Sequence, residues 1–251
     1  MISLKTSEWK LENIETVLLD KDGTFIDLHY FWGKMTELRV AEIIKRYGLA
    51  QESLAKLCFC LGYDVENGKM LPDGITALYS RSKIIEIFKD DLMRSGVQIT
   101  AQELENIFDY VSDVFYRDMD KYTKPIDTAV DFIKILHTKG VRLGIVTSDA
   151  KQSTHLTLKH FGWENLFDVV VGRECSAETK ESGALTKIAL KALDANPQTT
   201  VMIGDAPMDY ISAKNAGVER TILVASGQID KINLQKTSSY VVNSLSEVGI
   251  E

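Results

Sequence analysis

Short apolar runs and amphipathic stretches alternate along much of the chain, and this pattern indicates the class of fold. Apolar runs of strand length are found at residues 17–19, 141–146, 168–171, 200–203, 221–224 and 240–242. Helical spacing of apolar residues is found between them, at residues 127–139, 152–160, 183–193 and 210–216. Strands that alternate with helices form parallel sheets with right-handed crossovers. We therefore predict an α/β fold whose core is a three-layer, Rossmann-like parallel sheet with helices on both faces.

A long segment between the first two predicted strands carries only the spacing of helices. Helices are expected at residues 35–47, 52–61, 75–93 and 100–116. Thr100 and Glu103 have the spacing of a capping box at the start of the last of these helices. The segment 62–74 is rich in turn residues and is therefore expected to be a loop.

This difference in pattern divides the chain into two predicted domains. Residues 1–27 and 123–251 are expected to form the α/β core domain, and residues 28–122 an all-helical domain inserted into it. The chain has 251 residues, of which 45% are hydrophobic, and this size suits one large domain or two modest ones.

Charge and composition narrow the classes of partner. The formal net charge is −7, so nucleic acids and anionic membranes are not expected partners, because proteins that bind them present basic surfaces. The first residues do not have the pattern of a signal peptide, and no apolar run approaches the roughly 20 residues of a membrane span. We therefore expect a cytosolic protein. The three cysteines fit no zinc spacing and are expected to be free thiols.

Acidic residues stand directly after two of the predicted strands. Asp20 and Asp22 follow the first strand and are themselves followed by Gly23. Asp205 follows the strand at residues 200–203, and Asp209 comes one helical turn later. Acids at such positions also have ordinary structural roles, because Asp and Gly form turns and Asp caps helices.

These acids are expected to meet, because the carboxyl ends of parallel strands share one edge of the sheet. Gathered carboxylates repel one another unless a cation lies among them, and an all-oxygen set of ligands favours Mg²⁺. Two more polar residues belong to the same edge. Thr147 ends the second predicted strand, and Lys180 lies in a polar loop. Taken alone, Thr147 is also typical of a strand, and Lys180 of a solvated surface.

Read together and in order, these motifs resemble those of the haloacid dehalogenase superfamily. The four matching motifs are Asp20-Lys21-Asp22-Gly23-Thr24, Thr147, Lys180 and Gly204-Asp205-x-x-x-Asp209. The helical insertion resembles the cap of the phosphoglycolate phosphatase-like branch. Lys21 and Glu181 depart from the usual pattern, in which an apolar residue and a proline are common. Strand alternation predicts that Lys21 points away from a bound phosphate.

The resemblance implies phosphoryl transfer through an aspartyl-phosphate. It makes Asp20 the nucleophile, and Asp22 the acid that protonates the leaving group and then the base that activates water. Thr147 would hydrogen-bond a phosphoryl oxygen, and Lys180 would neutralise charge on the transferring group.

The same resemblance implies a Mg²⁺ site. The ion would be held by a carboxylate oxygen of Asp20, the backbone carbonyl of Asp22 and the side chain of Asp205. Asp209 would be a further ligand or would support the others. The expected substrate is a small phosphorylated metabolite.

Several alternatives stay open at this point. Asp22 argues against carbon–halogen cleavage, because departure of a halide needs no proton and haloacid dehalogenases proper lack this acid. A sugar phosphomutase of the same superfamily and a non-catalytic protein that binds phosphorylated ligands are both compatible with the motifs. Phosphonate hydrolysis would need a lysine in the cap that forms a Schiff base. The oligomeric state is not predicted.

Residues of the helical insertion are the candidates for substrate selection. They are His29, Tyr30, Trp32, Lys69 and Arg81. Each has an ordinary alternative, because aromatic residues at such positions also serve packing and Lys and Arg are usually solvated.

Overall fold

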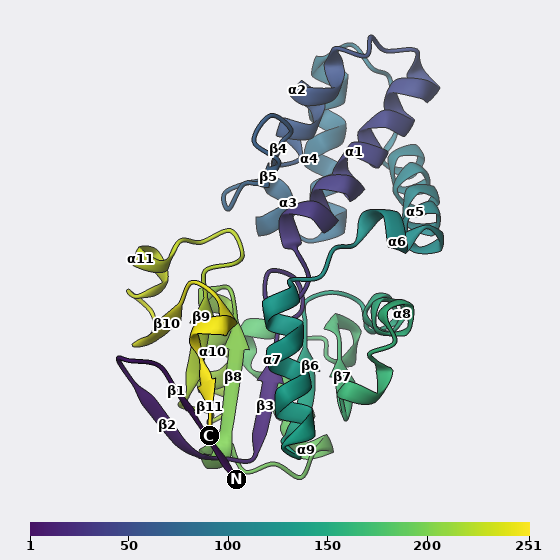
Figure 1. Ribbon diagram of the computed structural model, residues 1–251. Helices are drawn as coiled ribbons and strands as arrows, with labels where there is room; N and C mark the ends of the chain where they lie inside the picture. The colour runs from purple at the N-terminus through teal and green to yellow at the C-terminus, as the bar shows by residue number, and fades with distance from the viewer. The chain divides into compact units, whose positions relative to one another are not determined.

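The predicted apolar runs form one parallel sheet in the computed structural model, which describes residues 1–251 (Figure 1). The strands lie in the order β10-β9-β8-β3-β6-β7. Their bounds are β3 (Thr16–Leu19), β6 (Arg142–Val146), β7 (Val169–Val171), β8 (Thr200–Gly204), β9 (Thr221–Val224) and β10 (Tyr240–Val242). Every residue of β3 and β8 is buried, because both faces of the sheet are covered. The predicted α/β class and parallel sheet are thereby confirmed.

Helices of the same part of the chain pack on this sheet. They are α7 (Asp127–Thr138), α8 (Lys151–Phe161), α9 (Ala184–Ala192), α10 (Pro207–Asn215) and the short α11 (Lys231–Leu234). Leu185 of α9 and Ala213 of α10 share one apolar cluster with Met202 of the sheet. Five 3₁₀-helices complete the connections: Glu164–Leu166, Arg173–Cys175, Lys180–Ser182, Pro197–Thr199 and Leu245–Glu247.

A second, smaller sheet at the chain ends was not predicted from the sequence. It consists of β1 (Ile2–Lys5), β2 (Lys10–Ile14) and β11 (Gly249–Ile250), paired antiparallel in the order β11-β1-β2. These strands are short, and β11 has only two residues, so their apolar pattern is too brief to stand out. Ile14 and Leu4 are completely buried, which shows that the sheet packs one face inward.

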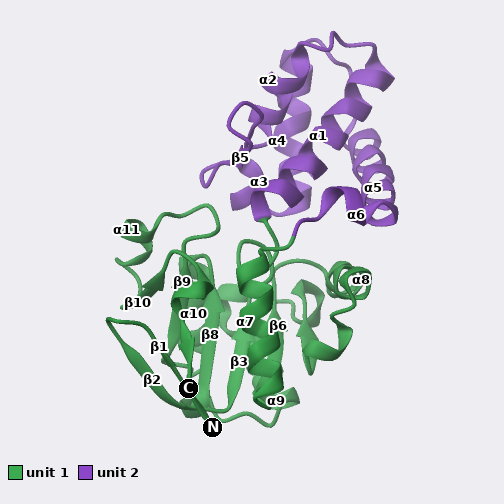
Figure 2. Cartoon of the chain, viewed as in Figure 1, with its two compact units in different colours: residues 1–27, 125–251 green, residues 28–124 purple.

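The chain divides into two compact units (Figure 2). Unit 1 comprises Met1–Asp27 and Pro125–Glu251, and unit 2 comprises Leu28–Lys124. The second boundary therefore lies two residues beyond the expected position. Pro125 already belongs to unit 1 because it pairs with Ile26, and the Ile126 N–H donates to the Phe25 carbonyl at 2.9 Å.

Unit 2 is mainly helical. Its helices are α1 (Leu28–Tyr47), α2 (Ser53–Cys60), α3 (Ile75–Leu78), α4 (Arg81–Arg94), α5 (Ala101–Arg117) and α6 (Met119–Tyr122). The capping box of Thr100 and Glu103 is present at the start of α5. The helix predicted at residues 75–93 is interrupted, because Tyr79 and Ser80 have extended backbone conformations. No helix of the chain has the length and apolarity needed to span a membrane.

A short hairpin corrects the expectation that this insertion is entirely helical. Strands β4 (Tyr63–Asp64) and β5 (Lys69–Met70) pair antiparallel inside the predicted loop. The Asp64 side chain closes the turn by accepting from the backbone N–H groups of Glu66 and Asn67. The Met70 N–H then donates to Nδ1 of His29 at 3.1 Å, which ties the hairpin to the start of α1.

Candidate active site

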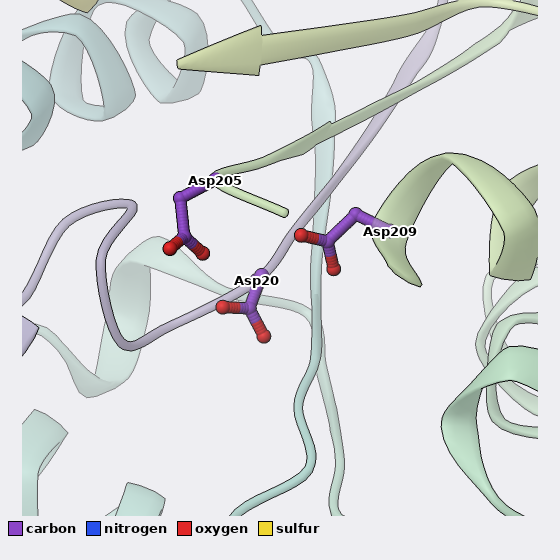
Figure 3. A group of neighbouring side chains, drawn as sticks. All are labelled: Asp20, Asp205 and Asp209. Atoms are coloured by element: carbon purple, nitrogen blue, oxygen red, sulfur yellow. The ribbon is translucent and has the colours of Figure 1, made fainter. Parts of the chain in front are cut away.

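Three carboxylates meet at the carboxyl edge of the parallel sheet (Figure 3). Asp20 follows β3, Asp205 follows β8, and Asp209 lies in the first turn of α10. Oxygen atoms of the three side chains lie within 4.8 Å of one another, and all three residues are buried. The fold thus brings together residues that are almost two hundred positions apart in the sequence, because parallel strands end on the same side.

Lys180 lies between two of these acids. Its Nζ is 2.5 Å from Oδ1 of Asp20 and 2.6 Å from Oδ1 of Asp209. The lysine side chain is only 3% exposed, so it is not the solvated loop residue that its local sequence also allows. Burial alone would lower the pKa of Lys180, but the charges of Asp20 and Asp209 outweigh it and raise that pKa. Lys180 therefore stays positively charged.

Asp209 has both carboxylate oxygens engaged by the protein. Oδ1 contacts Lys180, and Oδ2 accepts a hydrogen bond from the Ala206 N–H at 3.1 Å. Burial raises the pKa of Asp209 to about 6, although Lys180 opposes this shift. The side chain is thus held in place by an ion pair and by the start of α10.

Asp205 is confined by backbone on two sides. A Cβ atom added to Gly23 would lie 2.3 Å from Oδ2 of Asp205, and one added to Gly227 would lie 1.7 Å from the same oxygen. A side chain at either position would therefore displace the Asp205 carboxylate, and Gly23 also has a φ of +88°, which favours glycine. Burial, followed by repulsion from Asp20 and Asp209, raises the pKa of Asp205 well above its usual range.

This set of donors fits a hard divalent cation. One lysine accompanies three carboxylates, so negative charge is in excess. Burial is the largest cause of the raised pKa of Asp205, and repulsion from Asp20 and Asp209 adds to it. A cation among the oxygens would relieve that repulsion. Because the side chains offer only oxygen atoms, the arrangement suits a metal of the Mg²⁺ type.

Asp22 has a different set of neighbours from these three acids. Its Oδ1 lies 2.8 Å from Nζ of Lys21, and the same Nζ lies 3.0 Å from Oδ2 of Asp149. Burial raises the pKa of Asp22 to about 6, with Lys21 opposing the shift. Burial would lower the pKa of Lys21, but the charges of Asp149 and Asp22 raise it instead. The lysine is completely buried and positively charged.

Neither this role of Lys21 nor the contribution of Asp149 was predicted from the sequence. Strand alternation predicted only that Lys21 points away from a phosphate. The strand ends at Leu19, however, and beyond it the lysine contacts the carboxylate of the next residue, Asp22. In the sequence, Lys21 stands between Asp20 and Asp22, and no local signal pointed to Asp149 as its second partner.

Thr147 is buried at the end of β6, on the same edge of the sheet. Its hydroxyl oxygen accepts a hydrogen bond from the Asp149 N–H at 3.0 Å. This bond occupies an acceptor position and orients the side chain, while the hydroxyl proton can still be donated.

The loop after β9 also reaches the site. Ser226 donates a hydrogen bond to the Gly23 carbonyl at 2.6 Å, and Gly227 packs against Asp205. Neither Ser226 nor Gly227 was among the site residues predicted from the sequence. A Ser-Gly pair shortly after a buried strand of the same sheet was the available signal.

The candidate residues for substrate selection all lie in unit 2, where most have partners within that unit. Arg81 forms ion pairs with Glu105 at 2.6 Å and with Asp109 at 2.7 Å. The Tyr30 hydroxyl donates to the Lys121 carbonyl at 3.0 Å. His29 holds the β4–β5 hairpin, Lys69 is an exposed residue of β5, and Trp32 packs edge-on against Phe31. Their part in substrate selection stays a prediction.

Comparison with known proteins identifies relatives of the chain. Residues 72–224 match the family of haloacid dehalogenase-like hydrolases. Pyrophosphatase PpaX of Halalkalibacterium halodurans is 26% identical over 170 residues, which cover 68% of this chain and 79% of that protein.

Solved structures share the fold at lower identity. A predicted phosphoglycolate phosphatase from Haemophilus somnus superposes with a TM-score of 0.69 at 16% identity, over 94% of this chain and 97% of the other. A β-phosphoglucomutase from Clostridium difficile gives a TM-score of 0.60 at 16% identity, over 93% of this chain and 92% of the other. At these identities the likeness concerns the fold alone.

Proposed function

We propose, from the premise that this chain belongs to the haloacid dehalogenase-like hydrolase family, that it is a Mg²⁺-dependent phosphatase for a small phosphorylated metabolite. The observation that carries the proposal is the buried cluster of Asp20, Asp205 and Asp209 with Lys180 against two of its members. Such a cluster positions a nucleophilic carboxylate beside the charges needed to accept an anionic phosphoryl group.

Asp20 is the nucleophile in this proposal. Lys180 holds Oδ1 of Asp20, which leaves Oδ2 to attack phosphorus. The new bond joins this oxygen to phosphorus as the bond between phosphorus and the leaving oxygen breaks. The positive charge of Lys180 lies beside the carboxylate and reduces its repulsion from the incoming phosphate.

Asp22 carries the proton. In its protonated form it gives that proton to the departing oxygen, and the resulting carboxylate then takes a proton from water. The water oxygen attacks phosphorus and breaks its bond to Asp20, which restores both acids. A pKa of Asp22 near 6, raised by burial, suits a group that must both donate and accept a proton.

The metal site would use at least two of the three clustered acids directly. Asp20 and Asp205 would hold Mg²⁺ with their carboxylates, and Asp22 with its backbone carbonyl. When bound, the ion supplies positive charge that lets a carboxylate approach a phosphate. Asp209 would be a further ligand or would support the others, since its two oxygens also contact Lys180 and the Ala206 N–H. Thr147 donates its hydroxyl proton to a phosphoryl oxygen.

Hydrolysis of pyrophosphate is a second candidate function. It is favoured by the 26% identity to pyrophosphatase PpaX, which extends over 68% of this chain. The two functions differ in the leaving group, which is an alcohol in a monoester and phosphate in pyrophosphate. The same nucleophile and metal site serve both.

A panel of substrates with the purified full chain tests these proposals. It contains phosphate monoesters, pyrophosphate and sugar phosphates, each with Mg²⁺ and with excess chelator. We expect hydrolysis that needs the metal and that is lost in Asp20→Asn. Transfer to a sugar phosphate in place of release to water would identify a phosphomutase. A complete lack of turnover across the panel would instead favour a protein that only binds phosphorylated ligands.

A further inference from the structure

A chain of buried polar contacts begins in α8 and ends on Asp22. Ser153 donates a hydrogen bond to Oδ2 of Asp149 at 2.6 Å, and the Ala150 N–H donates to Oδ1 at 2.7 Å. Asp149 contacts Nζ of Lys21 at 3.0 Å, and Lys21 contacts Oδ1 of Asp22 at 2.8 Å. Both oxygens of Asp149 are thus fixed by the first turn of a helix, and Asp149 in turn fixes the lysine.

The burial of Lys21 is not explained by the stability of the fold alone. Its side chain is 0% exposed, and a charged group is costly to bury unless partners compensate for the lost water. An apolar side chain would fill this position without that cost. The compensation comes from Asp149 on one side and Asp22 on the other, so the ammonium group has a defined place between them.

This contact distinguishes the two oxygens of Asp22. Oδ1 is completely covered and faces Lys21, whereas the side chain as a whole retains 11% of its exposure. The exposed remainder therefore belongs to the other atoms of the side chain, which include Oδ2. A carboxylate held at one oxygen by a fixed cation cannot rotate freely, so its other oxygen points in one direction.

We propose that Lys21 and Asp149 are positioning residues for Asp22, which hold one carboxylate oxygen so that the other faces the leaving group. The inference rests on the proposed role of Asp22 in proton transfer. The geometry also links this network to Thr147, whose hydroxyl accepts from the Asp149 N–H at 3.0 Å. One loop thereby orients both the phosphoryl-binding hydroxyl and the proton donor.

Two aryl phosphates of nearly equal shape provide the test. Phenyl phosphate needs a proton on its leaving oxygen, whereas p-nitrophenyl phosphate releases an acidic phenol that needs little help. We expect Lys21→Met to lower kcat for phenyl phosphate about tenfold more than for p-nitrophenyl phosphate, because general acid catalysis contributes about 10²-fold or more in total. KM should change little for either substrate.

Companion variants separate positioning from folding. Asp149→Asn should shift the ratio of the two kcat values in the same direction by less, and Lys21→Arg should retain most of the ratio of the unaltered protein. Arg142→Met is the matched control, since Arg142 pairs with Glu15 at 3.5 Å at the other end of the same sheet. It should lower the unfolding temperature and leave the ratio unchanged.

Equal losses on both substrates in Lys21→Met, or a change in KM alone, would overturn the positioning role. If Lys21→Met yields no folded protein, Asp149→Asn decides: a shifted ratio supports the proposal, and an unchanged ratio overturns it. Asp22→Asn separates this failure from that of the proposed function. If Asp22→Asn itself shows no dependence on the leaving group, the proton-transfer role is wrong, whatever Lys21 does.

Discussion

Two buried lysines lie between pairs of carboxylates on one edge of the sheet, and their surroundings differ in charge. Lys180 faces Asp20 and Asp209 with Asp205 close by, so one cation meets three acids. Lys21 forms ion pairs with Asp22 and Asp149. The first region keeps an excess of negative charge and the second is nearly balanced.

The difference shows why only the first region suits a divalent ion. Asp205 has no ion pair with a protein side chain, whereas Asp149 receives a lysine, a serine hydroxyl and a backbone N–H. The pKa of Asp205 is raised well above its usual range by burial and by its acidic neighbours. The pKa of Asp149 is lowered, since Lys21 and Ser153 outweigh the effect of burial. The excess of carboxylates in the Lys180 region therefore suits a bound cation. The contacts in the Lys21 region suit the fixed placement of one acid.

The largest expected effect comes from Asp20, the proposed nucleophile in the Lys180 region. Asp20→Asn should lower kcat by at least about a thousandfold, because an amide cannot form the phosphorylated intermediate. Turnover of p-nitrophenyl phosphate with Mg²⁺ measures the loss. An unchanged unfolding temperature would show that the variant is folded, and near-normal activity in it would overturn the mechanism.

A smaller loss that depends on the substrate is expected in the Lys21 region. Asp22→Asn should lower kcat for alkyl phosphates by about 10²- to 10⁴-fold and affect p-nitrophenyl phosphate much less. The reason is that alkoxide leaving groups need a proton and the nitrophenolate does not. Comparison of kcat on the two classes of substrate checks this, and equal losses would contradict an acid role for Asp22.

The Mg²⁺ requirement is expected to differ between variants of the two regions. Asp205→Asn should raise the Mg²⁺ concentration that gives half-maximal activity by about 100-fold, since removal of even a supporting residue costs 10- to 100-fold in metal affinity. Mg²⁺ should also raise the unfolding temperature of the unaltered protein, because a ligand that binds only the folded state stabilises it. Asp149→Asn is the matched control, and its Mg²⁺ requirement should stay normal. A shift in that control would mean that the two regions are not independent.

The pH dependence of stability is the smallest of these effects. Asp205 and Asp209 have raised pKa values when folded, so in chelator the folded state binds protons more tightly than the unfolded state. Stability should therefore fall as pH rises from about 4 through the folded pKa of Asp209, which is about 6. Asp205→Asn should reduce this slope in thermal unfolding measured across that range. An identical slope in the variant would show that Asp205 is not protonated preferentially in the folded protein.

The sequence by itself determined the parallel sheet and the places of the main acids. Buried strands such as β3 and β8 are continuous apolar runs, and each is followed at once by an acid. Such local patterns need no knowledge of distant residues. Because parallel strands end on one side, the meeting of Asp20 with Asp205 followed from strand order alone.

Only the tertiary structure decided which charges meet inside that edge. Lys21 and Asp149 belong to loops after different strands. Ser226, in the loop after a third strand, donates a hydrogen bond to the Gly23 carbonyl. The terminal sheet and the β4–β5 hairpin likewise depend on pairing between segments too short to show a period of their own. Whether a lysine is solvated or buried between two acids depends on what the folded chain places beside it. Nothing in the residues next to Lys21 or Lys180 fixes that choice, because the free energy of burying a charge is set by its partners in space.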